Sequence, residues 1–519
     1  MYLTQAIHRA AATTPRARAT TFNGRTRSWV EVKERIARLA AALQALGAKA
    51  GDRVAILAVN SDRYLETYFA VPWAGAVIVP MNIRWSVPEH VYSIEDSGAE
   101  ILIVDDTFLQ AGLAVQKACA GIRHIIYAGE GASPPGLLGY EALVESHAPA
   151  ADAGRIGNDL AGIFYTGGTT GFPKGVMLSH QNLWTSSVCI GAGIRLTSAV
   201  RYLHAAPMFH LADGAMVCAA SIYGGSHVFM PSFDASHYLR IVEEERVTHA
   251  LLVPTMIRLL LDSPDLAKRD VSSLEYLIYG ASPMAESLLR TAMQKLPHVK
   301  FLQAYGQTEL SPLATILGPE WHVLDGPNAG KLRSAGRPAT CVEIRIIGAD
   351  GSEAPRGAVG EVHVRGPNAM LGYWNKPEQT AATLVDGWVH TGDGGYFDED
   401  GFLFIVDRIK DMIVSGGENV FSAEVENALM QHPAVSECAV IGVPDDKWGE
   451  RVHAIVVPKA GESVAGDALI AHCKALIAGY KCPRSVDVRS EPLPKSGAGK
   501  ILKVDLRKPF WAGQTRNVN

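Results

Sequence analysis

The chain has 519 residues, of which 48% are hydrophobic and 19% are charged, with a net charge of −5 and a pI near 6.4. A chain of this length and apolar content can bury large cores and is expected to divide into two or more domains. The slightly acidic balance and the lack of Lys/Arg runs argue against nucleic acid as a partner.

The seven cysteines are odd in number and include no CxxC pair, which fits neither a disulfide framework nor zinc-ligand spacing. The N-terminus has no continuous apolar core, and the most apolar run, residues 68–82, is broken by Pro72, Gly75 and Pro80. We therefore expect a cytoplasmic protein without a signal peptide or an integral membrane segment.

Helical and strand patterns alternate along the chain from its N-terminus. Ser28 and Glu31 form a capping box, apolar residues then recur at helical spacing, and Gly47 is expected to end this first helix. A second helix is expected around 64–69. Short apolar runs typical of buried strands occupy residues 52–59, 75–80 and 99–106.

The same alternation of helical and strand patterns continues through residues 248–254 and 273–282, and then changes. Residues 342–366 alternate polar and apolar residues between glycine turns, which predicts an antiparallel portion. A new βα rhythm begins near Lys410, with further strands at 437–444 and 452–459. We therefore predict an α/β fold: a large N-terminal domain, 1–409, of wound α/β layers with an antiparallel portion, and a small, mobile α+β domain, 410–519.

The stretch "FYTGGTTGFPKGVMLSH", residues 164–180, resembles a phosphate-binding loop without being a Walker motif, because Pro173 precedes the lysine and Gly175 follows it. Its glycines can turn backbone amides toward an anion, while its threonines and lysine add donors and charge. The alternative is a plain glycine-rich turn between a strand at 161–165 and a helix at 180–188. The residues expected to clasp polyphosphate are Thr166, Gly167, Gly168, Thr169, Thr170, Gly171 and Lys174.

Eight strings occur in an order and spacing that resemble the adenylate-forming superfamily, and most of all its acyl-CoA and aryl-CoA synthetases. They are "YTGGTTGFPKG", "PMFH", "YGAS", "QAYGQTE", "HTGD", "DRIKD", "SGGENVFSAEVE" and "LPKSGAGKILK". The resemblance covers essentially the whole chain. It implies that a carboxylic acid reacts with ATP to give an acyl-adenylate and pyrophosphate, and that the acyl group then passes to CoA.

Within "QAYGQTE", the resemblance implies that Tyr305 stacks on adenine, Thr308 bonds the α-phosphate and Glu309 binds Mg²⁺. A carboxylate beside phosphate oxygens makes chemical sense when a hard cation bridges them. An isolated Thr-Glu pair is equally typical of a helix N-terminus. The implied cofactors and co-substrates are ATP, Mg²⁺ and CoA.

Further nucleotide contacts are implied for residues that would otherwise be read as turns or surface ion pairs. Gly280, Ala281 and Ser282 of "YGAS", together with Gly306, would let adenine lie against backbone. Asp393 would bond the ribose hydroxyls, and Arg408 would add a ribose or phosphate contact.

The C-terminal motifs imply a division of labour between two half-reactions. Lys500, which could otherwise be a solvated surface lysine, matches the catalytic lysine of adenylation, although a Ser-Gly-Ala-Gly run replaces the more usual Thr-x-Thr-Gly before it. Gly416 and Gly417 would line the CoA tunnel after the small domain rotates about a hinge at Lys410. The alternative for the glycine pair is a hairpin turn.

The resemblance places the acyl pocket at Trp184, His210, Leu211, Ala304, Gly306 and Leu310. None of these is a charged residue aimed at a second carboxylate, so we expect an apolar acid. A fatty acid is favoured, with a benzoate-like or cinnamate-like acid close behind and the loading of a carrier protein as a further alternative. His210 is counted with the catalytic residues as a gate, against the alternative of a core histidine. The expected partners are the acid, ATP and CoA, and the family also allows a homodimer.

Overall fold

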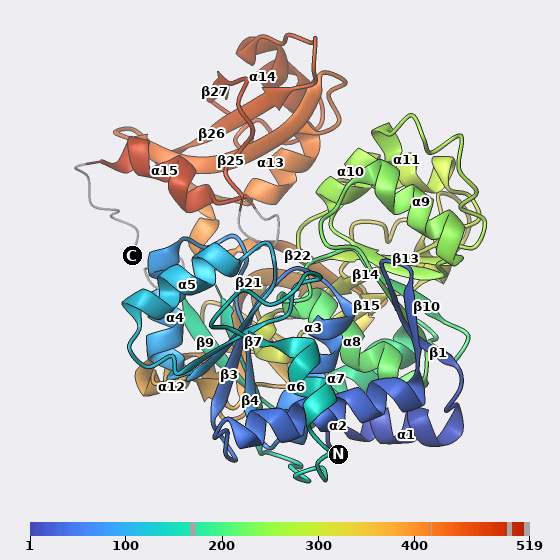
Figure 1. Ribbon diagram of the computed structural model, residues 1–519. Helices are drawn as coiled ribbons and strands as arrows, with labels where there is room; N and C mark the ends of the chain where they lie inside the picture. The colour runs from blue at the N-terminus through green and yellow to red at the C-terminus, as the bar shows by residue number, and fades with distance from the viewer. Residues whose placement is uncertain (167–172, 417, 496–500, 513–519) are drawn as a thin grey trace.

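The computed structural model describes residues 1–166, 173–416, 418–495 and 501–512. Two large sheets with parallel centres form the bulk of the molecule (Figure 1). The predicted fold class is confirmed: wound α/β layers, an antiparallel portion and a smaller C-terminal α+β unit.

The first large sheet brings together strands from residues 18 to 338. Its central strands, from β1 to β14, run parallel, and its two edges are antiparallel. In spatial order it contains β16 (Arg337–Pro338), β15 (Thr315–Leu317), β14 (Lys300–Tyr305), β13 (Tyr276–Gly280), β12 (His249–Leu252), β10 (Arg201–His204), β11 (Ser226–Phe229), β1 (Arg18–Phe22) and β2 (Arg25–Ser28).

The second large sheet takes its strands from residues 53 to 179 and 372 to 373, and its central strands are also parallel. In spatial order it contains β19 (Gly372–Tyr373), β9 (Lys174–Ser179), β8 (Leu160–Thr166), β4 (Val77–Pro80), β3 (Arg53–Leu57), β5 (Ile101–Val104), β6 (His124–Tyr127) and β7 (Leu138–Gly139). The strands expected at 52–59, 75–80 and 99–106 are therefore confirmed as β3, β4 and β5.

Helices fill the space between the two sheets and cover their outer faces (Figure 1). One shared core joins both sheets to α1 (Gln5–Thr13), α2 (Trp29–Ala45), α3 (Asp62–Trp73), α6 (Tyr140–Ser146), α7 (His180–Gly193) and α8 (Leu211–Tyr223). The outer faces are covered by α4 (Val87–Ser97) and α5 (Leu109–Ala118) on the second sheet and by α9 (Ala235–Glu245), α10 (Pro254–Asp262) and α11 (Glu286–Lys295) on the first.

Strand β3 shows why these runs are apolar throughout. Val54 and Ile56 belong to the core between the sheets, whereas Ala55 and Leu57 pack into the outer core beside α4 and α5. Alternate side chains of a strand point to opposite faces, so a strand covered on both faces has no polar side. The predicted first helix is also confirmed, with Glu31 accepting a hydrogen bond from the Ser28 amide at 2.7 Å and Gly47 at φ +100° just beyond its end.

A small antiparallel sheet follows the large ones, as the pattern of residues 342–366 predicted. It contains β17 (Glu343–Ile347), β18 (Gly360–Arg365), β20 (Leu384–Val385), β21 (Trp388–Phe397) and β22 (Leu403–Arg408), with α12 (Pro377–Thr383) beside it. Short 3₁₀ turns are η1 (Thr308–Leu310), η2 (Pro319–Trp321) and η3 (Ile409–Asp411).

The chain after β22 builds its own sheet and core, coloured orange to red in Figure 1. It contains β23 (Ile413–Ser415), β24 (Glu418–Val420), β25 (Val435–Asp445), β26 (Gly449–Pro458), β27 (Ser485–Val488), α13 (Ser422–Leu429), α14 (Gly466–Lys474) and α15 (Lys503–Trp511). Hydrogen bonds that cross the predicted boundary include Ser422 N to Asp407 Oδ2 at 2.6 Å. The boundary at Lys410 and the mobility of this unit stay predictions.

The helices and cysteines add two observations. In the described part of the chain, no helix combines the length and apolarity needed to cross a bilayer. All seven cysteines are free thiols, and Cys341 is the one that is not buried.

The buried histidines make the fold sensitive to acid. Burial lowers the pKa of His90, His180, His249 and His322 to about 4, against about 6.5 in an unfolded chain. Between about pH 6.5 and pH 4 these histidines are therefore protonated in the unfolded chain but neutral in the folded chain. The free energy of unfolding thus falls as the pH is lowered through this window.

We expect the urea midpoint to fall steadily between pH 7 and pH 4.5. His249→Asn, which cannot titrate there, should flatten that slope relative to the wild type. A midpoint that stays constant over this range would contradict the expectation.

Candidate active site

The glycine-rich stretch lies between two paired strands. Strands β8 and β9 pair antiparallel, with Thr166 opposite Lys174, so the predicted phosphate lysine faces the predicted phosphate threonine across the pair. The expected direct connection from a strand to a helix is wrong, because β9 precedes α7, and the choice between a phosphate clasp and a plain turn stays open. Gly167, Gly168, Thr169, Thr170 and Gly171 lie outside the described residues.

Helix α7 begins immediately after β9 because a reciprocal cap stops the strand. Ser179 Oγ accepts a hydrogen bond from the Asn182 amide at 3.1 Å, and Asn182 Oδ1 accepts one from the Ser179 amide at 2.8 Å. The hairpin is thus joined rigidly to α7, which carries Trp184.

Asp393 is the centre of a polar cluster between the first large sheet and the small antiparallel sheet. Tyr305 at the end of β14 donates its hydroxyl to Asp393 Oδ2 at 2.6 Å, and Arg408 on β22 places Nε 2.7 Å from Oδ1. Asp393 and Arg408 are paired directly in the β21–β22 register. Each carboxylate oxygen keeps a lone pair, so Asp393 can still accept bonds from a diol.

The environment fixes the protonation of this cluster. Burial, with the Asp393 charge adding to it, raises the pKa of Tyr305 well above its ordinary value, so the phenol stays a donor. For Arg408, burial opposes the charged form, but Asp393 together with Tyr305, Glu309 and Asp411 outweighs it, and the pKa is raised. The structure therefore brings together the three residues predicted for adenine, ribose and phosphate, although their contacts with a nucleotide stay predictions.

Glu309 lies in η1, next to Thr308, and is 8% exposed. Tyr373 on β19 donates its hydroxyl to Glu309 Oε1 at 2.8 Å. The Lys174 ammonium lies 4.8 Å from the centre of the Tyr373 ring. Tyr373 therefore links the predicted metal ligand to the predicted phosphate lysine, a role the sequence analysis missed.

The residues around Glu309 fit a hard divalent cation. A single buried carboxylate is too few ligands for a protein-enclosed site, but it suits Mg²⁺, which keeps waters and shares phosphate oxygens. When bound, the ion would neutralise charge on the phosphates. Glu309 would be its ligand from this chain.

The predicted adenine turn is shaped by two close backbone approaches. A Cβ on Gly280 would lie 2.2 Å from the Ala304 carbonyl oxygen, and one on Gly306 would lie 1.9 Å from the Pro312 carbonyl oxygen. Only glycine fits at either position. Ala281 has φ +61°, a conformation that L-residues rarely adopt and that clusters at functional sites.

His322 supports this turn through a hydrogen bond to Tyr279, and the sequence analysis did not single it out. Its Nδ1 lies 2.9 Å from the Gly318 carbonyl oxygen, which can only accept, so Nδ1 carries the proton. Nε2 is then free to accept the Tyr279 hydroxyl at 2.9 Å, immediately before Gly280. Ser282 follows the turn and is half-buried.

The residues predicted for the acyl pocket are placed in different surroundings. Leu211 is buried and Trp184 is partly buried in the core between the sheets, Ala304 packs on the core formed by α7, α8 and β10, and fully buried Leu310 packs beneath the small sheet. His210 is half-buried and caps α8, where its Nδ1 accepts from the Ala212 amide at 3.3 Å. This bond indicates that His210 stabilises the start of α8, and its role as a gate stays a prediction.

Two ionisable groups beside this region are already paired. Asp213, fully buried, accepts from the Tyr202 hydroxyl at 2.8 Å and lies 2.7 Å from His204 Nδ1. His204 Nε2 in turn meets His227 Nδ1 at 2.9 Å. Neither group is left to bind a charged substrate tail.

The C-terminal site residues are only partly described. Lys410 lies in η3, whereas Gly417 and Lys500 lie outside the described residues. Gly416 has φ +64°, and a Cβ there would lie 2.5 Å from Trp448 Cε3, so glycine is required where this segment turns.

A histidine–glutamate cluster on the small sheet does not make a metal site. Glu361, His363 and His390 hold their ligand atoms within 4.8 Å of one another. However, the two imidazole rings are stacked, 3.7 Å apart and 14° from parallel. Lone pairs lie in the ring planes, so two stacked rings cannot both aim at one ion. Glu361 instead accepts from the Gly392 amide at 3.0 Å and supports the turn before Asp393.

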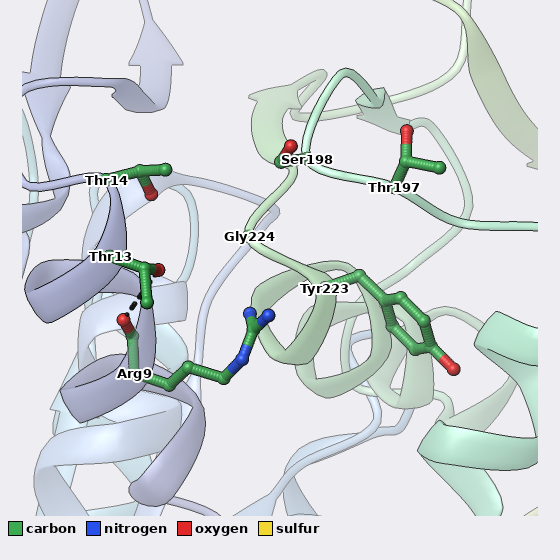
Figure 2. A pocket seen from close by; sticks show the side chains of 7 residues that line it. All are labelled: Arg9, Thr13, Thr14, Thr197, Ser198, Tyr223 and Gly224. Atoms are coloured by element: carbon green, nitrogen blue, oxygen red, sulfur yellow. Dashed lines mark hydrogen bonds between the residues drawn. The ribbon is translucent and has the colours of Figure 1, made fainter.

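A surface cavity of about 320 Å³ lies elsewhere, between the C-terminal ends of α1 and α8 (Figure 2). Three of its lining residues already donate hydrogen bonds within the protein: Arg9 to the Ile222 carbonyl at 3.0 Å, Thr13 to the Arg9 carbonyl at 2.9 Å and Tyr223 to the Val188 carbonyl at 3.1 Å. We therefore place the candidate site at the clusters around Asp393 and Glu309 rather than in this cavity.

Comparison with known proteins identifies the family of the chain. Residues 7–374 match the family model "AMP-binding enzyme", and residues 424–500 match "AMP-binding enzyme C-terminal domain". A feruloyl-CoA synthase of Amycolatopsis sp is 41% identical over 503 residues, which cover 97% of this chain and 98% of the relative.

Two further proteins that are similar to this chain have different substrates in their names. The fatty acid–[acyl-carrier-protein] ligase ScoC of Streptomyces coeruleorubidus is 36% identical, covering 97% of this chain and 96% of the relative. The crystal structure of the anthranilate CoA ligase AuaEII with anthranoyl-AMP superimposes with a TM-score of 0.90 at 27% identity, covering 98% of this chain and 97% of that one. The chain therefore belongs to the adenylate-forming superfamily, within its family of AMP-binding acyl-CoA and aryl-CoA synthetases.

Proposed function

We propose that this AMP-forming ligase activates an apolar monocarboxylic acid and transfers the acyl group to CoA. The observation that carries the proposal is that Tyr373 contacts both Glu309 and Lys174, that Tyr305 and Arg408 both contact Asp393, and that Glu309 is close enough to Arg408 to raise its pKa. These groups supply the cations, the metal ligand and the diol acceptor that a nucleoside triphosphate requires.

In the first half-reaction, a carboxylate oxygen attacks the α-phosphorus, the bond from that phosphorus to the β-phosphate oxygen breaks, and pyrophosphate leaves. Asp393 orients the ribose, while Lys174 and Arg408 offset the charge that builds on the phosphate oxygens. Glu309 would hold Mg²⁺, which would supply further neutralisation of the phosphates.

In the second half-reaction, the CoA thiolate attacks the acyl carbon, the acyl–phosphate bond breaks and AMP leaves. The change between the steps is assigned to rotation of residues 410–519 about Lys410, which exchanges Lys500 for the Gly416–Gly417 segment.

An aromatic acid of the cinnamate type is the first candidate substrate. The support is the 41% identity to a feruloyl-CoA synthase together with the mutual pairing of Asp213 and His204, which leaves neither to bind a second charge. A fatty acid is the second candidate because the 36% identical relative ScoC acts on fatty acids, and its carrier-protein acceptor keeps carrier loading as an alternative second step.

The test is pyrophosphate release from ATP and Mg²⁺ with ferulate, 4-coumarate, benzoate, octanoate, dodecanoate and, as a doubly charged control, malonate. Each acid is run alone, with CoA and with a phosphopantetheinylated carrier protein. We expect fastest release with a cinnamate-type acid, and a thioester product only with CoA. Thioester on the carrier alone would assign carrier loading, preference for malonate would overturn the apolar pocket, and no release with any acid would overturn the proposed function.

A further inference from the structure

Tyr373 contacts both Glu309 and Lys174, which do not form an ion pair with each other. Its hydroxyl bonds Glu309 Oε1 at 2.8 Å, and its ring lies 4.8 Å from the Lys174 ammonium. Within the described residues, neither Glu309 nor Lys174 has an oppositely charged partner at salt-bridge distance. A buried carboxylate and a nearby ammonium would ordinarily be drawn together, since their attraction is only weakly screened.

The backbone around Tyr373 leaves the side chain little freedom. Tyr373 pairs with Val176 across β9, and its amide bonds Thr380 Oγ1 at 2.8 Å. The next residue continues the attachment, with the Trp374 amide donating to the Gly175 carbonyl at 2.8 Å. The residue is only 6% exposed. Tyr373 is therefore fastened to the same hairpin that carries Lys174.

The same segment is also attached to the turn that carries Glu309. The Met370 amide donates to the Glu309 carbonyl at 2.9 Å. Carboxylate oxygens only accept, so the Tyr373 hydroxyl is the donor to Oε1. This bond engages one oxygen of the carboxylate, Oε1.

We propose that Tyr373 is a positioning residue that holds Glu309 and Lys174 apart, the hydroxyl orienting the carboxylate toward Mg²⁺ and the ring retaining the ammonium for phosphate. The inference rests on the proposed function, because it takes Glu309 as the metal ligand. Without the spacer, Glu309 and Lys174 would pair directly, and the site would lose a metal ligand and a phosphate cation together.

Two substitutions separate the two contacts. Tyr373→Phe keeps the ring over Lys174 and removes the bond to Glu309, whereas Tyr373→Leu removes both. The matched control is Tyr140→Phe, because Tyr140 is also buried and donates to a buried glutamate, Glu66 Oε2, at 2.9 Å, away from the candidate site. Loss of a hydrogen bond to a charged group is expected to weaken cation binding about tenfold.

The readout is binding of Mn²⁺, a paramagnetic substitute for Mg²⁺, measured by EPR of free Mn²⁺ with a non-hydrolysable ATP analogue. Tyr373→Phe should weaken Mn²⁺ binding about tenfold with unchanged analogue affinity, and Tyr373→Leu should weaken both. Tyr140→Phe should match the wild type. In turnover, the Mg²⁺ requirement of Tyr373→Phe should rise while the KM for the acid stays constant.

The outcomes distinguish this inference from the proposed function. Unchanged Mn²⁺ binding in Tyr373→Phe, or an equal loss in Tyr140→Phe, would overturn the positioning role even if the enzyme releases pyrophosphate. Selective weakening in Tyr373→Phe would support it even if no acid in the panel were turned over, since the binding measurement needs no acid.

Discussion

Glu309→Gln is expected to reduce Mg²⁺-dependent pyrophosphate release by about 100-fold or more. Glutamine keeps the shape of the side chain and can still accept the Tyr373 hydroxyl, so the packing of η1 should survive. It removes the negative charge and can present an amide NH₂ where the cation needs an oxygen. The loss is therefore one of charge at the metal rather than of structure.

The measurement is a Mg²⁺ titration of pyrophosphate release at saturating ATP and acid, with thermal unfolding recorded on the same preparation. A melting temperature close to that of the wild type would show that the variant is folded. Full pyrophosphate release by the folded variant would show that the metal role of Glu309 is wrong.

Lys500→Ala is expected to slow acyl-adenylate formation by about 100-fold or more and to leave thioester formation nearly unchanged. The lysine is proposed to bring its charge to the carboxylate and α-phosphate only while these two react. Once the adenylate has formed, the proposed rotation about Lys410 withdraws it, and its loss should no longer matter. Supplied with pre-made acyl-adenylate and CoA, the variant should form thioester near the normal rate.

Single-turnover assays of the two half-reactions test this division on one preparation. Lys495→Ala is the matched control, because it removes a positive charge from the same segment, where Lys495 pairs with Glu437 inside the small unit. The control should retain both half-reactions. Equal damage to both half-reactions in Lys500→Ala would contradict the two-pose scheme.

The local patterns predicted the elements well wherever both faces of a strand are covered. The runs that became β3, β4 and β5 are apolar throughout because cores lie on both sides of their sheet. Strand β9 (Lys174–Ser179) was harder to predict, because it begins with a charged residue inside a motif that is also consistent with a loop. Its identity as a strand depends on pairing with β8, which the residue types of the motif do not indicate.

By itself, the sequence determined the family, and its eight ordered motifs predicted which side chains the site offers and in which order. Only the tertiary structure decided how these side chains are held. The Tyr373–Glu309 bond joins residues 64 positions apart, and the Tyr305–Asp393 bond joins residues 88 positions apart. Such bonds exist because separate sheets share buried cores, and the free energy of that packing comes from apolar surface spread over the chain. A motif specifies the functional groups, whereas the packing of the sheets sets the distances between them and their orientations.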